Sequence, residues 1–262
     1  MNRIEAIFSD IDGTLVSFRT HRIPPSAVTA LAEAKRRGVK IFISTGRPRS
    51  FINNIGEIEH LVDGYITVNG ACCEINGEIL GTEHIDNEDA ARMVDFIIKR
   101  HIPCVIMGIH GNCMLNATAQ TDRLMVDMLN IGHECLSMAL DDIMHDSILQ
   151  ITPFADIATE RELLDGLPGY NAARWHPDFC DITSARADKG RGLLTVARHE
   201  NIDVASTMAL GDGGNDLPII RRAGIGVSMG NATPDVKMAA DYVTAHIDDD
   251  GMAVALRHFG VI

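Results

Sequence analysis

Four aspartates in this sequence stand in two pairs that could share a metal ion. One residue separates Asp10 from Asp12, three separate Asp212 from Asp216, and glycines beside both pairs favour turns. Carboxylates held close together repel one another, so a proton or a cation must offset their charge. Mg²⁺ accepts a few carboxylate oxygens together with water and a phosphate oxygen. The aspartates therefore indicate a Mg²⁺ site, where the cation would ease the approach of an anionic nucleophile to a phosphate ester.

A hydroxyl, a loop and a lysine could bind phosphate oxygens at such a site. Thr45 offers the hydroxyl, the backbone amides of Gly46 and Arg47 follow it, and Lys189 offers a point charge. Each of these clusters taken alone is equally well explained as an ordinary turn. Their combination favours chemistry on a phosphate group.

The strands that must position these residues fall in two separate stretches of the chain. Six apolar runs have strand length: 4–8, 39–43 and 65–68 in the first stretch, and 207–210, 225–228 and 242–243 in the second. Helix patterns alternate with them, which predicts a parallel sheet with helices on both faces. Residues 72–80, with Asn76-Gly77 at their centre, predict a hairpin.

The helices between these strands are marked by prolines, glycines and apolar spacing. We expect helices to begin at Pro24, after Pro48, at Lys189, around Ile219 and after Pro234. The acidic run at 248–250 is interpreted as a helix N-cap on a solvated surface and not as a second metal site.

A doubly wound order of the six strands would bring the polar clusters together. In the order 3-2-1-4-5-6, the first strands of the two stretches are neighbours, and ligands bind beyond the carboxyl ends where the order reverses. Asp10 and Asp12 would then lie beside Asp212 and Asp216, and Thr45 would face the same crevice. The predicted fold class is therefore α/β, with a doubly wound, Rossmann-like core.

The middle of the chain has a different pattern and predicts an inserted domain. Helices are expected at 87–100, 121–130 and 156–164, and strands at 103–108, 148–152, 172–175 and 180–183. The economical arrangement is a core of residues 1–82 and 184–262 that is interrupted by an α+β domain of residues 83–183.

Composition excludes several classes of protein. The 262 residues carry a net charge of 23 − 36 = −13, the wrong sign for an extended surface that grips nucleic acid. No apolar run approaches the roughly 18 residues of a membrane span, and Glu5, Asp10 and Asp12 interrupt any signal-peptide core. The six cysteines include no C-x-x-C pair and are expected to be reduced. These features predict a cytoplasmic protein with no nucleic-acid or membrane partner.

The motifs also resemble those of a known family, the haloacid dehalogenase-like (HAD) phosphohydrolases. Residues 10–14, with the sequence D-I-D-G-T, are similar to the family's nucleophile motif, and 44–47 to its second motif. Lys189 matches the third, and 211–216 resemble the G-D-x-x-N-D metal motif. Residues 69–71 and 226–231 also resemble the family, and the inserted domain is similar to the type IIB (C2B) cap of its Cof-like branch.

The resemblance implies a role for each residue of these motifs. Asp10 would be the nucleophile that attacks phosphorus and forms an aspartyl-phosphate, with Thr45 and Lys189 as its partners in binding the phosphate. Asp12 would protonate the leaving alcohol and then deprotonate the hydrolytic water.

The same resemblance implies a ligand set for Mg²⁺. The Asp10 carboxylate, the Asp12 backbone carbonyl and Asp212 would hold the ion. Asn215 and Asp216 would support the metal and the phosphate loop.

Residues that contact the substrate are expected in both domains. The candidates are Gly46, Arg47, Asn69, Asn215, Arg174 and Trp175, with Asp181 as a further possible contact. For Trp175 two interpretations stand side by side. It could belong to the core of the inserted domain, or it could lie with Arg174 on a face that meets a sugar.

The sequence therefore predicts a Mg²⁺-dependent phosphatase for small phosphate monoesters, above all hexose or pentose phosphates. A phosphomutase of the same fold and a non-enzymatic phosphate or metal sensor are the alternatives. A small-molecule phosphate ester is the expected partner, and the oligomeric state is left open.

Overall fold

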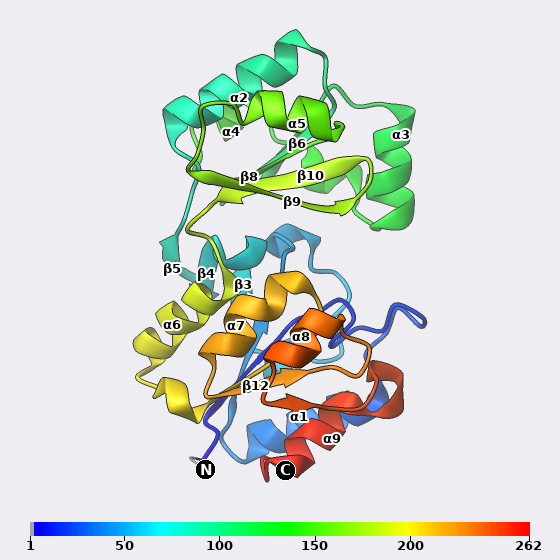
Figure 1. Cartoon of the computed structure of the whole chain (residues 1–262), viewed down its shortest axis with the longest axis vertical. Helices are drawn as coiled ribbons and strands as arrows, with labels where there is room; N and C mark the ends of the chain where they lie inside the picture. The colour runs from blue at the N-terminus through cyan, green and yellow to red at the C-terminus, as the bar shows by residue number, and fades with distance from the viewer. Residues whose placement is uncertain (1–2) are drawn as a thin grey trace. The chain divides into compact units, whose positions relative to one another are not determined.

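The computed structural model describes residues 3–262, except for the side chains of residues 127 and 128, and the chain divides into two compact units. We call the first unit the core: it combines the chain up to Thr82 with Asp188–Ile262 (Figure 1). We call the second unit, Glu83–Ala187, the cap. The cap ends at residue 187, later than the predicted 183. Over the residues described, no helix is long and apolar enough to cross a bilayer.

An eight-stranded sheet forms the centre of the core. Its strands are β1 (Ala6–Ser9), β2 (Lys40–Ser44), β3 (Gly64–Thr67), β4 (Cys72–Ile75), β5 (Glu78–Thr82), β11 (Thr207–Gly211), β12 (Ile225–Ser228) and β13 (Tyr242–Val243). They lie in the order β13-β12-β11-β1-β2-β3-β4-β5, parallel from β13 to β3 and antiparallel from β3 to β5. The predicted doubly wound order is confirmed. The hairpin at the end of the sheet turns at Asn76 and Gly77, which both have positive φ.

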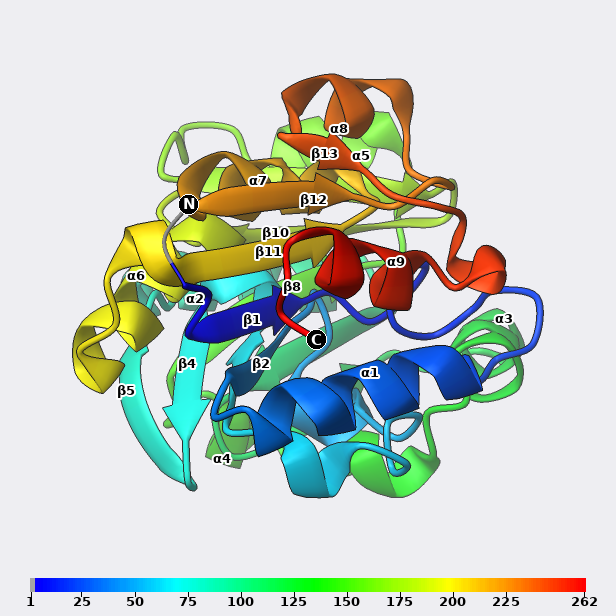
Figure 2. The same cartoon turned by 90° about the horizontal axis from the view of Figure 1, so that it is seen from below.

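Helices cover both faces of this sheet (Figure 2). They are α1 (Pro25–Arg36) and α9 (Gly251–His258) on one face, and α6 (Lys189–Glu200), α7 (Leu217–Arg222) and α8 (Pro234–Ala239) on the other. Adjacent side chains of β1 point to opposite faces. Ile7 shares a buried cluster with Leu31 of α1, whereas Phe8 shares one with Leu193 of α6. Strand β1 is therefore buried on both faces, as the central strand of a parallel sheet must be.

Helix α1 shows how local sequence sets the bounds of these elements. Pro25 is its first residue, where the missing N–H has no helical partner to lose. Ala30, Leu31 and Ala34 are buried at helical spacing. Gly38, with φ of +83°, follows the helix and turns the chain into β2.

The cap is built on a five-stranded antiparallel sheet of its own. Its strands are β6 (Cys104–Gly108), β7 (Asn112–Leu115), β8 (Ile148–Pro153), β9 (Tyr170–His176) and β10 (Phe179–Ser184), in the order β7-β6-β8-β10-β9. Helices α2 (Asn87–Lys99), α4 (Leu140–Ile143) and α5 (Ile157–Leu163) pack on one face of it. The predicted α+β insertion is thus observed as an antiparallel sheet with helices on one side (Figure 1).

Two predicted helices differ from the structure. The segment after Pro48 forms only a 3₁₀ turn at Arg49–Phe51, because the asparagines and the glycine that follow favour turns. The helix predicted at 121–130 begins earlier, as α3 (Ala119–Asp122), and continues as π-helical Arg123–Met128.

The interpretation of the acidic run at 248–250 was also partly wrong. Asp250 does occupy the N-cap position of α9, but its side chain makes no capping hydrogen bond. Asp248 instead accepts hydrogen bonds from Ser17 Oγ at 2.7 Å and Arg19 Nε at 2.9 Å. The run therefore ties the loop after β1 to the turn before α9.

Candidate active site

A buried ion-pair network forms where β1 and β11 end side by side. Asp10 directly follows β1, and its Oδ1 atom lies 2.6 Å from Lys189 Nζ. Lys189 is fully buried at the first position of α6, and its Nζ also lies 2.6 Å from Asp216 Oδ1. Burial lowers the pKa of Lys189, but the two carboxylates outweigh it, so the net shift is upward and the lysine stays charged. Burial raises the pKa of Asp10, as does Asp216, against the opposing effect of Lys189.

Asp216 also holds the loop that carries Asp212. Its Oδ2 atom accepts hydrogen bonds from the backbone N–H groups of Asp212 and Gly213, both at 3.0 Å. One carboxylate thus fixes the lysine with one oxygen and the loop with the other.

Two side chains orient Asp212 itself. Thr14 Oγ1 donates to Asp212 Oδ1 at 2.9 Å, and Asn231 Nδ2 lies 3.5 Å from Asp212 Oδ2. Asn231 also donates to the carbonyl of Gly13 at 2.7 Å and accepts from the N–H of Ile247. It therefore links the loop after β1, the loop after β11 and the turn before α9.

The donor set and its charge fit a hard divalent cation. One carboxylate oxygen from each of Asp10, Asp212 and Asp216 lies within 4.8 Å of the others. Three carboxylates and the single ammonium of Lys189 leave an excess of two negative charges. Burial, and to a smaller extent repulsion from Asp216, raise the pKa of Asp212 to about 6 despite the hydrogen bond from Thr14. A cation with +2 charge and oxygen ligands would relieve this repulsion.

The second predicted carboxylate, Asp12, pairs with Arg47. The guanidinium makes two hydrogen bonds, Nε to Asp12 Oδ2 at 2.8 Å and Nη2 to Asp12 Oδ1 at 2.9 Å. Its Nη1 donates to the carbonyl of Phe51 at 3.1 Å. Arg47 thus holds Asp12 in a planar, two-point contact, and its contact with the substrate stays a prediction.

Thr45, Gly46, Asn69 and Asn215 form the polar loops beside these carboxylates. Thr45 is buried at the end of β2, and its Oγ1 accepts the N–H of Arg47 at 3.1 Å. Asn69 is in the left-handed region with φ of +52°, and its Oδ1 accepts from Asn215 Nδ2 at 3.0 Å. A Cβ added at Gly46 would lie only 3.2 Å from that same Oδ1. The ends of β2, β3 and β11 thus contribute adjoining loops.

The side chains of the two predicted cap residues, Arg174 and Trp175, lie on opposite faces of β9. Arg174 donates to Glu160 Oε2 at 2.7 Å and to the carbonyls of Ala155 and Pro177, so its guanidinium is used inside the cap. Trp175, next in sequence on β9, points to the other face of the strand and is 58% exposed. The guanidinium of Arg174 is thus engaged inside the cap and the indole of Trp175 is exposed, while substrate contact stays a prediction for both.

Thr14 and Asn231 were missed as candidate site residues. Thr14 lies within the D-x-D-G-T motif and Asn231 within 226–231, so both stood in segments already singled out. Thr14 pairs with Asp212, 198 residues away, and Asn231 pairs with Gly13, 218 residues away, and local patterns cannot show such pairings.

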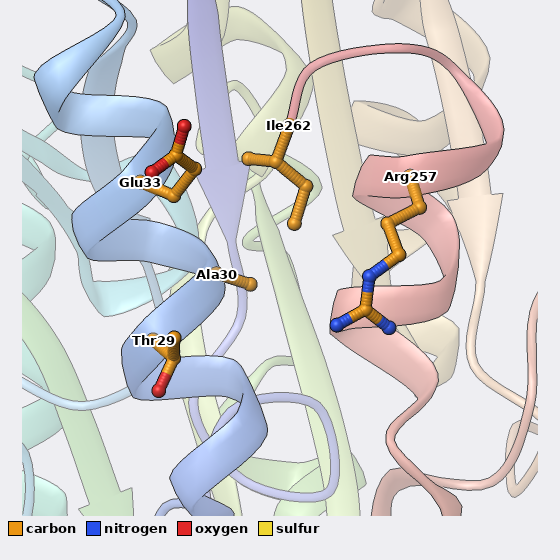
Figure 3. A pocket seen from close by; sticks show the side chains of 5 residues that line it. All are labelled: Thr29, Ala30, Glu33, Arg257 and Ile262. Carbon is orange, nitrogen blue, oxygen red and sulfur yellow. The ribbon is translucent and has the colours of Figure 1, made fainter.

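A shallow groove of about 320 Å³ lies elsewhere on the core, between α1 and α9 (Figure 3). The side chains that line it are Thr29, Ala30, Glu33, Arg257 and Ile262. None of them is a predicted site residue, and the groove adds nothing to the carboxylate network.

Comparison with known proteins agrees with the motifs. The family model described as haloacid dehalogenase-like hydrolase matches residues 7–256. Among solved structures, the HAD subclass IIB sugar phosphatase BT4131 is 42% identical, with a TM-score of 0.88, over 98% of this chain and 100% of that one.

Two further relatives match over nearly their whole length. The phosphatase BT1666 from Bacteroides thetaiotaomicron is 32% identical with a TM-score of 0.85, over 99% of this chain and 96% of that one. The 5-amino-6-(5-phospho-D-ribitylamino)uracil phosphatase YcsE from Bacillus subtilis is 27% identical over 256 residues, which cover 98% of this chain and 96% of the relative.

Proposed function

Since the chain belongs to the haloacid dehalogenase-like hydrolase family, we propose that this phosphoric monoester hydrolase uses Mg²⁺ and acts on small sugar phosphates through an aspartyl-phosphate. The observation that carries the proposal is the buried chain Asp10–Lys189–Asp216 beside Asp212, at the point where the strand order reverses. A carboxylate that is buried, held by a lysine and surrounded by excess negative charge is suited to a metal-assisted nucleophile.

In this proposal the first step transfers the phosphoryl group to Asp10. A carboxylate oxygen of Asp10 forms a bond to phosphorus while the bond from phosphorus to the ester oxygen breaks. Asp12 gives its proton to that leaving oxygen, which departs as an alcohol. Lys189 keeps the Asp10 carboxylate in place, and Thr45 with the backbone amide of Gly46 binds the phosphate oxygens.

The second step returns the enzyme to its starting state. Asp12, now ionised, takes a proton from water, and the resulting hydroxide attacks phosphorus. The bond between phosphorus and Asp10 breaks, and inorganic phosphate leaves. The two-point contact with Arg47 directs the Asp12 carboxylate, and each of its oxygens keeps a second lone pair that can take the proton.

The residues that would hold Mg²⁺ are Asp10, Asp212 and the backbone carbonyl of Asp12. When bound, the ion supplies positive charge that offsets the repulsion between carboxylates and phosphate. Asp216 is buried and accepts three hydrogen bonds, from Lys189 and from the N–H groups of Asp212 and Gly213, so we assign it, with Asn215, to supporting the loop.

The substrate class and the location rest on supporting observations. BT4131 is a sugar phosphatase, and YcsE acts on a phosphate ester of a ribityl group, so polyhydroxylated leaving groups are common to both. We propose that the cap, Glu83–Ala187, selects among such esters. Five of the cysteines are buried thiols inside the two units, which supports a reducing, cytoplasmic location.

A panel of phosphate esters tests the proposal. We expect the protein with Mg²⁺ to release inorganic phosphate from hexose and pentose phosphates, and to release none in excess chelator. Asp10→Asn should abolish release because it removes the attacking charge, while Asp165→Asn, at an exposed carboxyl of the cap, should match the parent protein. Isomerised product without free phosphate would instead show a phosphomutase, and no reaction at all would favour a sensor. Equal release by Asp10→Asn would reject the covalent mechanism.

A further inference from the structure

One face of the cap sheet carries a set of side chains that the proposed mechanism does not use. Alternation along β8, β9 and β10 places Thr152, Trp175, Phe179 and Asp181 on the face opposite the helices, since Cys180 and neighbouring inward residues pack with α2 and α5. We call these four residues the cap platform. It lies wholly within the cap.

A chain of hydrogen bonds joins the polar members of the cap platform. Trp175 Nε1 donates to Asp181 Oδ2 at 2.8 Å, and Thr152 Oγ1 donates to Asp181 Oδ1 at 2.8 Å. Gln150 Nε2 in turn donates to Thr152 Oγ1 at 2.9 Å. Both oxygens of Asp181 are therefore fixed in direction, and each still has a lone pair that can accept a further hydrogen bond.

Asp181 has no cation beside it among the described residues. Burial raises its pKa, and only the hydrogen bonds from Trp175 and Thr152 oppose that shift. Gln150 is 2% exposed, and its Oε1 atom has no hydrogen-bond partner in the described part of the chain. A buried acceptor without a donor is costly, and the half-buried carboxylate of Asp181 keeps lone pairs that can accept further hydrogen bonds. This surplus of acceptors favours a ligand that brings hydroxyl groups.

Trp175 presents an apolar surface next to these acceptors. Its ring meets Phe179 edge to face with centroids 4.7 Å apart, and Phe179 is buried and stacked on His176 at 5.1 Å. The indole is thus held at its N–H by Asp181 and along its edge by Phe179. An exposed aromatic ring that is fixed in this way loses little entropy when a second flat, apolar surface packs on it.

We propose that the cap platform binds the uncharged, polyhydroxylated part of a ligand, with C–H groups against Trp175 and hydroxyl groups donating to Asp181. A phosphate is disfavoured there, because the carboxylate is negative and none of the described residues places a cation beside it. The identification of this part as the leaving group of a phosphate ester rests on the proposed function.

Fluorescence tests the platform directly, because Trp175 is the only tryptophan of the chain. We would titrate the full-length Asp10→Asn variant, which cannot turn over, with hexose 6-phosphates, pentose 5-phosphates and alditol phosphates, and with methyl phosphate as a ligand that has neither hydroxyl groups nor an apolar surface for Trp175. At least one polyhydroxylated ester should shift the emission saturably, and methyl phosphate should not. No shift with any of the esters would overturn the proposal.

Variants of the acceptors complete the test. Asp181→Asn and Thr152→Val, each placed on the Asp10→Asn background, should raise the Kd of the responding ester tenfold or more. Asp165→Asn, on the same background, should leave it unchanged. Thr152→Val keeps the carboxylate and serves if Asp181→Asn fails to fold, which thermal unfolding would reveal. Unchanged affinity in a folded Asp181→Asn or Thr152→Val variant would also overturn the proposal.

The two proposals fail separately. A protein with Asp10 intact that hydrolyses no ester, while the Asp10→Asn variant still shows the tryptophan response, would reject the phosphatase assignment and keep the platform. Hydrolysis of sugar phosphates without any response of Trp175 would keep the phosphatase and reject the platform.

Discussion

At the scale of single residues, the pair formed by Arg47 and Asp12 determines how the proposed acid–base group is held. We expect Arg47→Lys to lower kcat by about 10- to 100-fold with a smaller change in KM, since an ammonium cannot make the two-point contact that orients Asp12. Steady-state kinetics with a hexose phosphate measures this. Arg49→Lys is the matched control, because Arg49 is a neighbouring surface residue that pairs with Glu59. A similar fall in kcat in both variants would mean that any lysine in this loop lowers activity, and that the contact with Asp12 is not the cause.

Asp212 gives a prediction about stability and pH. Its folded-state pKa of about 6 lies above the unfolded value of about 3.9, so the folded protein binds the extra proton and loses stability as pH rises through that interval. At pH 8 the negative charge of Asp212 therefore opposes folding of the metal-free protein. We expect Asp212→Asn to stabilise that form by about 1–2 kcal/mol at pH 8 and by almost nothing near pH 4.

Thermal unfolding in chelator at the two pH values measures this difference. With excess Mg²⁺ at pH 8 the parent protein should be the more stable of the two, because only the parent keeps the carboxylate of Asp212 as a ligand. A metal-free Asp212→Asn variant that is less stable than the parent at pH 8 would contradict the assignment of repulsion in the network.

At the scale of elements, the turn after β3 is packed against the start of α6. A Cβ on Gly70, which has φ of +95°, would lie 2.2 Å from the carbonyl oxygen of Asp188, the N-cap of α6. Gly70→Ala should therefore cost about 3 kcal/mol or more and lower activity, because α6 begins with Lys189. Gly77→Ala is the matched control. Gly77 has a similar φ of +79°, but a Cβ added there would have no neighbouring atom within 4 Å. Its substitution should therefore cost only about 1 kcal/mol of backbone strain.

Chemical denaturation of the two variants gives both free energies of unfolding, and phosphate release gives their activities. Equal losses in Gly70→Ala and Gly77→Ala would show that backbone strain alone, without the contact to α6, accounts for the effect.

Element positions were largely predictable from the sequence because apolar runs and turn residues are local signals. Strand β12 was predicted with its observed bounds, since a glycine precedes it and the apolar run is short and clear. Strand β7 was missed, because its four residues begin with a polar asparagine and two are only half-buried. The helix expected after Pro48 does not form. Proline allows a helix to start there, but the residues that follow favour turns.

At the scale of the whole molecule, the cap has the features of an independent folding unit. It is continuous in sequence, and a buried cluster of its own joins its sheet to α2, α4 and α5. We expect residues 83–187, expressed alone, to unfold cooperatively, and Trp175 to report the transition by its emission. A gradual transition without a plateau would show that the cap depends on the core for its stability.

The arrangement of the site was predictable at this same scale, whereas its internal contacts were not. The doubly wound order expected for six strands that alternate with helices is what brought Asp10 toward Asp212, and the sheet has that order. The partners of Arg47 and Arg174 depend on where long side chains end, and several acceptors lay within reach of each. Sequence spacing cannot choose among such acceptors.

The pairing of β1 with β11, which joins Ala6 to Thr207, also sets the order in which the protein can form during synthesis. A ribosome releases β1 and β2 long before β11 exists, so the middle of the sheet stays open on one side while the entire cap is made. The cap can fold in that interval from contiguous chain. The carboxylates at positions 10, 212 and 216 meet only after most of the polypeptide has emerged, so a truncated nascent chain that ends before β11 carries a finished cap and no metal site.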